Sequence, residues 1–192
     1  MNLAVVSTEW LKMEFEQNFI QLRDRDQRLA ELLKFHAGLV CSVGTAAVAL
    51  LGLKGFGQRV ELIGMLLVGT GVVGTAVLLC MVAFRRYFVQ SARQINAIRQ
   101  FAASEMGEDL ARRVLVLSTS PDQPRYWNAR SAHTAVLALV AFLNAALSGV
   151  GVYAICEGRH VAAGWAAVLA GLAFSFLAGV AGLCFRCGLR DD

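Results

Sequence analysis

The chain has 192 residues, of which 57% are apolar and 17% are charged, and its mean hydropathy is +0.56. The apolar share exceeds the roughly 45–50% of a soluble domain, and the charged share lies below the usual quarter. Composition therefore argues against a disordered tail, a soluble enzyme and a soluble nucleic-acid-binding domain, although the net charge is +4. We expect an all-α integral membrane protein whose main partner is the lipid bilayer, with no direct role in nucleic-acid binding.

Residues 1–34 are predicted to form a cytoplasmic amphipathic helix. Their apolar side chains recur at helical spacing and fall on one stripe. Acidic and basic residues nearly cancel in this segment, whereas helices that lie on a membrane are usually rich in Lys and Arg. We therefore expect the stripe to pack against another helix of the chain. Its members are Leu11, Phe15, Phe19, Leu22, Leu29 and Leu33.

Four later stretches are each long and apolar enough to cross a hydrocarbon core of about 30 Å as a helix. They form two short hairpins, 35–84 and 133–185, and the first and second spans are expected to continue into the cytoplasm as helices. The fold class is thus all-α, with four transmembrane helices. The predicted spans are Phe35–Leu53, Glu61–Phe84, His133–Ile155 and Val161–Phe185.

The basic residues predict the orientation of these spans. Fifteen of the 18 Lys and Arg residues lie in segments 1–34, 85–132 and 186–192, and three lie in the two hairpin loops. Because cytoplasmic loops carry the excess of Lys and Arg, we expect both termini, the connection 85–132 and the tail 186–192 to be cytoplasmic. A bacterial inner membrane is the expected location.

The connection 85–132 contains the main candidate for a binding site. Its first 20 residues hold no acid, Gly or Pro, so the second span should continue as a stalk with a basic face, while Tyr87 and Ile95 belong to an opposite apolar face. Ser104 is a candidate N-cap for a following short helix that includes residues 110–117. The basic face could pair with acids of segment 1–34 or bind a cytoplasmic protein or a phosphate-bearing ligand. Its candidate binding residues are Arg86, Arg93, Asn96 and Arg99.

Asn144 is a polar residue at the centre of the third span, where it either forms a hydrogen bond between helices or lines a pore. His36 and His133 lie at span edges and are expected to be interfacial. Small residues recur at every fourth position of the last span and permit close helix packing within or between chains, which favours a homo-oligomer. The packing residues are Gly171, Ser175 and Gly179, with Ala167 before them, and a shorter ridge comprises Ala141, Ala145 and Gly149.

No catalytic motif is recognised, so we expect a protein without enzymatic activity, cofactor or metal. Cys184 and Cys187 have C-x-x-C spacing but lack a second ligand pair. Cys156 is expected at the outer surface. The preferred hypothesis is an oligomeric sensor or effector whose cytoplasmic helices dock a partner or anionic ligand and act on the membrane, a layout that resembles small effectors of bacterial defence. A small channel or transporter with a path near Asn144, and a scaffold subunit of a membrane complex, are the alternatives.

Overall fold

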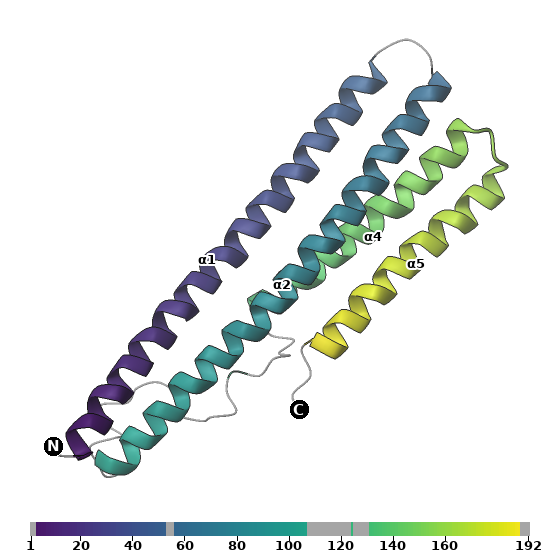
Figure 1. The fold of residues 1–192 in the computed structure, drawn as a ribbon. Coiled ribbons are helices and arrows are strands. Elements are labelled where there is room, and N and C mark those ends of the chain that lie inside the picture. Colours follow the sequence, from purple (N-terminus) through teal and green to yellow (C-terminus); the bar gives the residue numbers. More distant parts are fainter. Residues whose placement is uncertain (1–2, 53–55, 107–123, 125–130, 189–192) are drawn as a thin grey trace. The chain divides into compact units, whose positions relative to one another are not determined.

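The computed structural model describes residues 3–52, 56–106, 124 and 131–188. Within these residues all regular secondary structure is helical, with four α-helices and no strand, as predicted. Three of the helices are long and apolar enough to cross a membrane, and the apolar stretch Ala163–Phe176 is shorter. The helices are α1 (Leu3–Leu51), α2 (Phe56–Met106), α4 (Ala132–Gly158) and α5 (Ala163–Gly188) (Figure 1).

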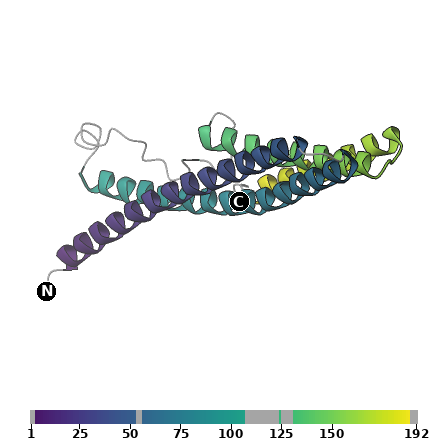
Figure 2. The same ribbon diagram turned by 90° about the horizontal axis from the view of Figure 1, so that it is seen from above.

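The two long helices, α1 and α2, each run without interruption (Figures 1 and 2). The predicted helical extensions of the first and second spans are therefore confirmed as helix. The predicted cap at Ser104 is wrong, because Ser104 lies inside α2 and its hydroxyl donates to the carbonyl oxygen of Phe101 at 2.7 Å. The short helix expected over 110–117 lies outside the described residues.

The chain forms two compact units. Of the described residues, the first comprises 3–30, 83–106 and 124, and the second comprises 31–52, 56–82 and 131–188. Each long helix therefore contributes one segment to each unit.

In the first unit, α1 turns a mixed polar and apolar face inward. Leu29 is 9% exposed, as the predicted stripe requires, and Phe15 and Leu22 are half-buried. Phe19 is the exception to the stripe, because it is 52% exposed while Asn18 is 6% exposed. The Asn18 side chain is accommodated by donating through Nδ2 to the carbonyl oxygen of Glu14 at 2.9 Å. The inward face thus departs from the predicted stripe at this turn, where Asn18 takes the place expected for Phe19.

In the second unit, α2 and α4 cross at a pair of glycines. A Cβ atom on Gly64 would lie 2.6 Å from the carbonyl oxygen of Gly151, and one on Gly151 would lie 2.7 Å from that of Gly64. Only residues without a side chain permit this approach of the two backbones. Leu78 and Met81 are buried further along α2, at 1% and 0% exposure.

Helices α4 and α5 pack as a hairpin (Figure 1). Gly149 lies at the contact, since a Cβ there would be 3.3 Å from the carbonyl oxygen of Ala170. The rings of Phe142 and Phe174 meet edge to face with centroids 6.0 Å apart. Ala141 and Ala145 are also buried, so the ridge predicted in this segment is a packing surface within the chain.

The end of α4 is closed by hydrogen bonds that satisfy its last carbonyl groups. The amide of Val161 donates to the carbonyl oxygen of Cys156 at 2.9 Å, and that of His160 donates to Glu157 at 3.0 Å. These two bonds define a Schellman motif, which places its C′ residue in the left-handed region. His160 holds this position with φ of 58°, although glycine is the residue usually found there.

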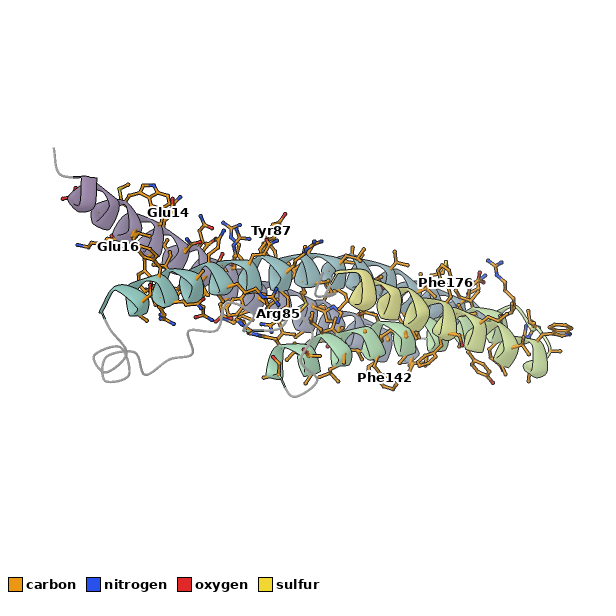
Figure 3. The ribbon with its side chains drawn as sticks, turned by 90° about the horizontal axis from the view of Figure 1, so that it is seen from below. Glu14, Glu16, Arg85, Tyr87, Phe142 and Phe176 are labelled. Atoms are coloured by element: carbon orange, nitrogen blue, oxygen red, sulfur yellow. The ribbon has the colours of Figure 1, made fainter. Side chains whose placement is uncertain are left out.

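Many large apolar side chains of the second unit are exposed. Phe142 and Phe176 project outward from α4 and α5 at 62% and 70% exposure (Figure 3), and Val48, Trp165 and Leu172 are exposed to a similar degree. Soluble monomers rarely expose contiguous apolar surface of this kind, whereas lipid tails solvate it. The exposed surface is therefore compatible with a membrane environment.

Candidate functional site

A polar cleft of about 440 Å³ lies in the first unit, lined by residues of both α1 and α2. On α1, the lining residues are four positions apart and share a face; on α2, they occupy two successive turns. The cleft is open on one side. Its lining consists of Gln21 and Arg25 from α1, and Tyr87, Gln90, Ser91, Arg93 and Gln94 from α2.

Both guanidinium groups of the cleft are held by contacts with neighbouring groups. The guanidinium carbon of Arg25 lies 4.6 Å from the centroid of the Tyr87 ring, a cation–π distance. The Nε atom of Arg93 donates to the carbonyl oxygen of Pro124 at 3.2 Å. Ser91, at 4% exposure, forms part of the buried wall. The two positive charges are thus positioned before any ligand binds.

The chemistry of the lining favours an anion. Two guanidinium groups, three primary amides and a serine hydroxyl supply hydrogen-bond donors, and none of the seven lining residues is acidic. Arginine pairs with carboxylates and phosphates through parallel hydrogen bonds, which fixes both charge and orientation. A volume of about 440 Å³ falls within the range of about 300–1,000 Å³ typical of small-molecule sites.

The four predicted binding residues do not form one surface. Arg93 lines the cleft, whereas Arg86 is exposed and lies outside its lining. Asn96 is 7% exposed, and its Oδ1 atom accepts a hydrogen bond of 3.5 Å from Arg99. The guanidinium carbon of Arg99 lies 5.7 Å from the centroid of the Phe15 ring on α1. The prediction of a single basic face is therefore wrong in its extent.

Arg85, the first residue of the predicted basic face, is also turned inward. It is 5% exposed, and its guanidinium carbon lies 5.4 Å from the centroid of the Phe88 ring. Burial lowers the pKa of its guanidinium below the ordinary value, because it disfavours the charged form. Arg85 and Tyr87 project from opposite sides of α2 (Figure 3). The helical wheel placed Arg85 on the same basic face as the other arginines, but its side chain is buried and its apolar stem packs against the protein.

Acidic residues of segment 1–34, Asp24 among them, were one of the partners considered for the basic face. Asp24 instead accepts a hydrogen bond of 2.8 Å from Arg28, one turn along its own helix, and both side chains are more than half exposed. This pair lies outside the lining of the cleft.

Sequence reasoning missed Gln21 and Arg25 on α1 and the polar residues beside Arg93 on α2. The available signal was their spacing: Gln21 and Arg25 are one turn apart, and Gln90, Arg93 and Gln94 share a face. The sequence prediction named Arg93 but did not weigh the glutamines beside it or a contribution from α1.

The second unit contains the predicted membrane-core residue, Asn144. It is 1% exposed, and neither its Oδ1 nor its Nδ2 atom has a hydrogen-bond partner in the structure. The interhelical hydrogen bond considered for this residue is therefore not formed. His36 lies close by and is 2% exposed, so its side chain is buried within the chain; its place at the edge of a membrane span stays a prediction.

The predicted packing residues of α5 do not lie in a packed contact with the other described parts of the chain. Gly171, Ser175 and Gly179 are exposed, and a Cβ atom on either glycine would meet no atom within 4 Å. Packing between chains stays a prediction. Cys156 is 6% exposed and lies on the packed side of α4, and its place on the outer side of the membrane stays a prediction. The side chains of Cys184 and Cys187 lie outside the described set.

No protein-family model, curated protein or solved structure matches the chain. Within the described residues, no three His, Cys, Asp or Glu side chains gather in a way that could hold a metal ion. The cleft of the first unit and the buried polar residues of the second are therefore the candidate functional features.

Proposed function

We propose that the chain is a non-enzymatic, multi-pass membrane protein that senses an anionic, phosphate-bearing ligand through the cleft of its first unit. Four spans, cytoplasmic termini and a bacterial inner membrane belong to this proposal. The distribution of basic residues supports the orientation, since 15 of 18 fall in the segments assigned to the cytoplasm.

The observation that carries the proposal is the pair of positioned guanidinium groups, Arg25 and Arg93, in a cleft without acidic lining residues. Exposed arginines near a membrane can act simply through anionic lipid headgroups, at about 1 kcal/mol each. Attraction to headgroups needs only exposed positive charge, whereas a cleft lined by two helices holds its arginines in fixed positions around a bound ligand. Amide groups beside the two arginines add the neutral donors that phosphate oxygens accept.

Sensing requires that binding alters the membrane part of the molecule. Both helices that line the cleft, α1 and α2, continue without interruption into the apolar segments of the second unit. A ligand that draws Arg25 and Arg93 toward one anion shifts one helix relative to the other. Packed helices respond to such shifts as rigid elements, so the change can reach the spans. The second part of the proposal is that this change, in an oligomer, alters the permeability of the bilayer.

Calorimetry with inorganic pyrophosphate as the probe tests the proposal on the full chain in detergent. Arg93→Gln and Arg25→Gln should each weaken binding by about 10- to 100-fold, because a hydrogen bond to a charged group contributes about 1.5–3 kcal/mol. Arg86→Gln is the matched control: it removes the same charge from an exposed position outside the cleft and should change binding less than about threefold. Equal losses in all three variants would assign the effect to net charge and would overturn the cleft as the site.

The proposed change in bilayer permeability has its own test. Expression of the chain should let a membrane-impermeant dye enter cells, and Arg93→Gln should reduce that entry without reducing the amount of inserted protein. A membrane potential that stays intact under every condition would refute the change in permeability, and only the ligand-binding part of the proposal would remain.

A small channel is the second candidate, favoured by the buried and unpartnered side chain of Asn144. Solute flux into proteoliposomes that Asn144→Leu abolishes would support this candidate over the first. A scaffold role would instead yield a stoichiometric partner bound through 1–34 or 85–130, without conductance.

A further inference from the structure

A cluster of buried polar side chains lies where α1, α2 and α4 meet in the second unit. His36 from α1, and Asn144 and Ser148 from α4, are 2%, 1% and 2% exposed. Every side-chain nitrogen and oxygen atom of these three residues lacks a hydrogen-bond partner in the structure. All three residues belong to the second unit, and none of them lines the cleft of the first.

Two glycines of α2 bring the cluster together. A Cβ atom on Gly74 would lie 2.7 Å from Cε1 of His36 and would also overlap the carboxamide oxygen of Asn144. His36 and Asn144 therefore approach the same point of the α2 backbone. One turn earlier, a Cβ atom on Gly71 would overlap the Ser148 hydroxyl and lie 2.9 Å from the carbonyl oxygen of Asn144. The glycines leave the polar atoms of α1 and α4 without bulky neighbours on α2.

Unpartnered polar atoms are costly in this setting. A buried amide or hydroxyl without a hydrogen bond destabilises the folded state, and lipid supplies no donor or acceptor in compensation. Three such side chains at one junction would together oppose folding. Buried water commonly satisfies such groups, making about three hydrogen bonds to otherwise unpaired atoms.

The donors and acceptors of the cluster fit water better than a cation. A neutral imidazole has one donor and one acceptor, the carboxamide has both, and the hydroxyl has both. Water matches such a mixed set because it also donates and accepts. Alkali and alkaline-earth cations require a shell of oxygen atoms, and the imidazole and amide nitrogens here do not provide one.

We propose that His36, Asn144 and Ser148 form a water-binding site inside the second unit, and that the imidazole of His36 exchanges protons with the bound water. In this exchange a hydronium ion donates its proton to the bare ring nitrogen and becomes water. The N–H bond at the other ring nitrogen then breaks, and its proton passes to a second water molecule. The ring returns to its neutral form as the other tautomer, and no redox change occurs. Ionisable residues within membrane segments commonly mark such proton-carrying positions.

The site can be tested without any ligand in the cleft, so its failure and the failure of the proposed function are distinguishable. The full chain, labelled with ¹⁵N-histidine, is placed in vesicles of phosphatidylethanolamine and phosphatidylglycerol. Solid-state NMR then measures magnetisation transfer from water to the imidazole nitrogens. The chain has three histidines, and His36→Gln assigns the signals of His36 by their loss.

We expect the rate of magnetisation transfer from water to the His36 nitrogens to lie within about twofold of the rate for exposed His160. The ring N–H of His36 should exchange in deuterated buffer within minutes. Ser148→Ala should slow the transfer several-fold by removing one partner of the water. Thr45→Ala is the matched control, because it removes an exposed hydroxyl from α1, and should leave the transfer unchanged. Asn144→Leu, with helical content checked by circular dichroism, provides a second variant with the same expectation as Ser148→Ala.

Transfer to His36 as slow as that to a dry core group would overturn the site. Fast transfer that neither variant alters would also overturn it, because the water would then be held by other residues. Fast transfer with a ring N–H that fails to exchange would refute the proton-exchange step.

Discussion

Replacing Gly64 by alanine is the most direct way to test the crossing of α2 and α4. The new Cβ would lie 2.6 Å from the carbonyl oxygen of Gly151 and 2.8 Å from the amide nitrogen of Ile155. Ordinary van der Waals contact begins at 3.4 Å, so the helices must separate by about 0.8 Å. The obstacles are backbone atoms, which cannot move aside by a rotamer change. Overpacking of this kind costs about 1–3 kcal/mol.

Gly69→Ala is the matched control on the same helix. A Cβ at Gly69 would meet no atom within 4 Å, so only helix propensity changes, in favour of alanine by up to about 1 kcal/mol. We expect the free energy of unfolding in mixed micelles to fall for Gly64→Ala and to hold or rise for Gly69→Ala. If the two variants are equally stable, the close crossing at Gly64 and Gly151 is not present in solution.

Further stability predictions concern three positions and use the same unfolding measurement. Leu78→Ala should cost about 2–5 kcal/mol because Leu78 is 1% exposed, whereas Leu79→Ala, at 46% exposure, should cost less than about 1 kcal/mol; reversed costs would place the other face of α2 inward. His160→Gly should stabilise by up to about 1 kcal/mol because φ is 58°, and His160→Val should destabilise; the opposite order would contradict the left-handed turn. Glu61→Gln breaks a 2.6 Å ion pair with exposed Arg159 and should lower the free energy of unfolding by less than about 1 kcal/mol at low salt, and by less again at high salt. A loss of stability that does not depend on salt would contradict this account.

The four helices could be predicted from the sequence because long apolar stretches and helical periodicity are local properties. The predicted third span, His133–Ile155, lies within α4 (Ala132–Gly158), and the fourth, Val161–Phe185, largely coincides with α5 (Ala163–Gly188). Their assignment as spans depends on the bilayer, so it remains a proposal for the fourth helix.

The rotation of each helix about its axis was harder to predict. Hydrophobicity placed Phe19 inward, but Asn18 takes that position because its amide is satisfied by the backbone one turn earlier. The same difficulty spread the predicted basic face over residues that point in different directions. Arg93 could be nominated from its charge, whereas Arg25 enters the cleft only because α1 and α2 lie together there.

Asn144 was recognisable from sequence as a polar residue within an apolar stretch. Its neighbours were not, because His36 is 108 positions away and meets it only where Gly74 lacks a side chain. Glycines at helix crossings of this kind are visible in a sequence, but the residues they bring together depend on which helices pair.

The central claim is that the chain crosses a membrane with its first unit in the cytoplasm. A direct measurement is labelling by a membrane-impermeant maleimide in a background whose five native cysteines are replaced by alanine. The account predicts that Glu157→Cys is labelled in intact cells and that Gln100→Cys is labelled only after the membrane is opened. Labelling of Gln100→Cys from outside intact cells, or release of the chain from vesicles by carbonate, would contradict it.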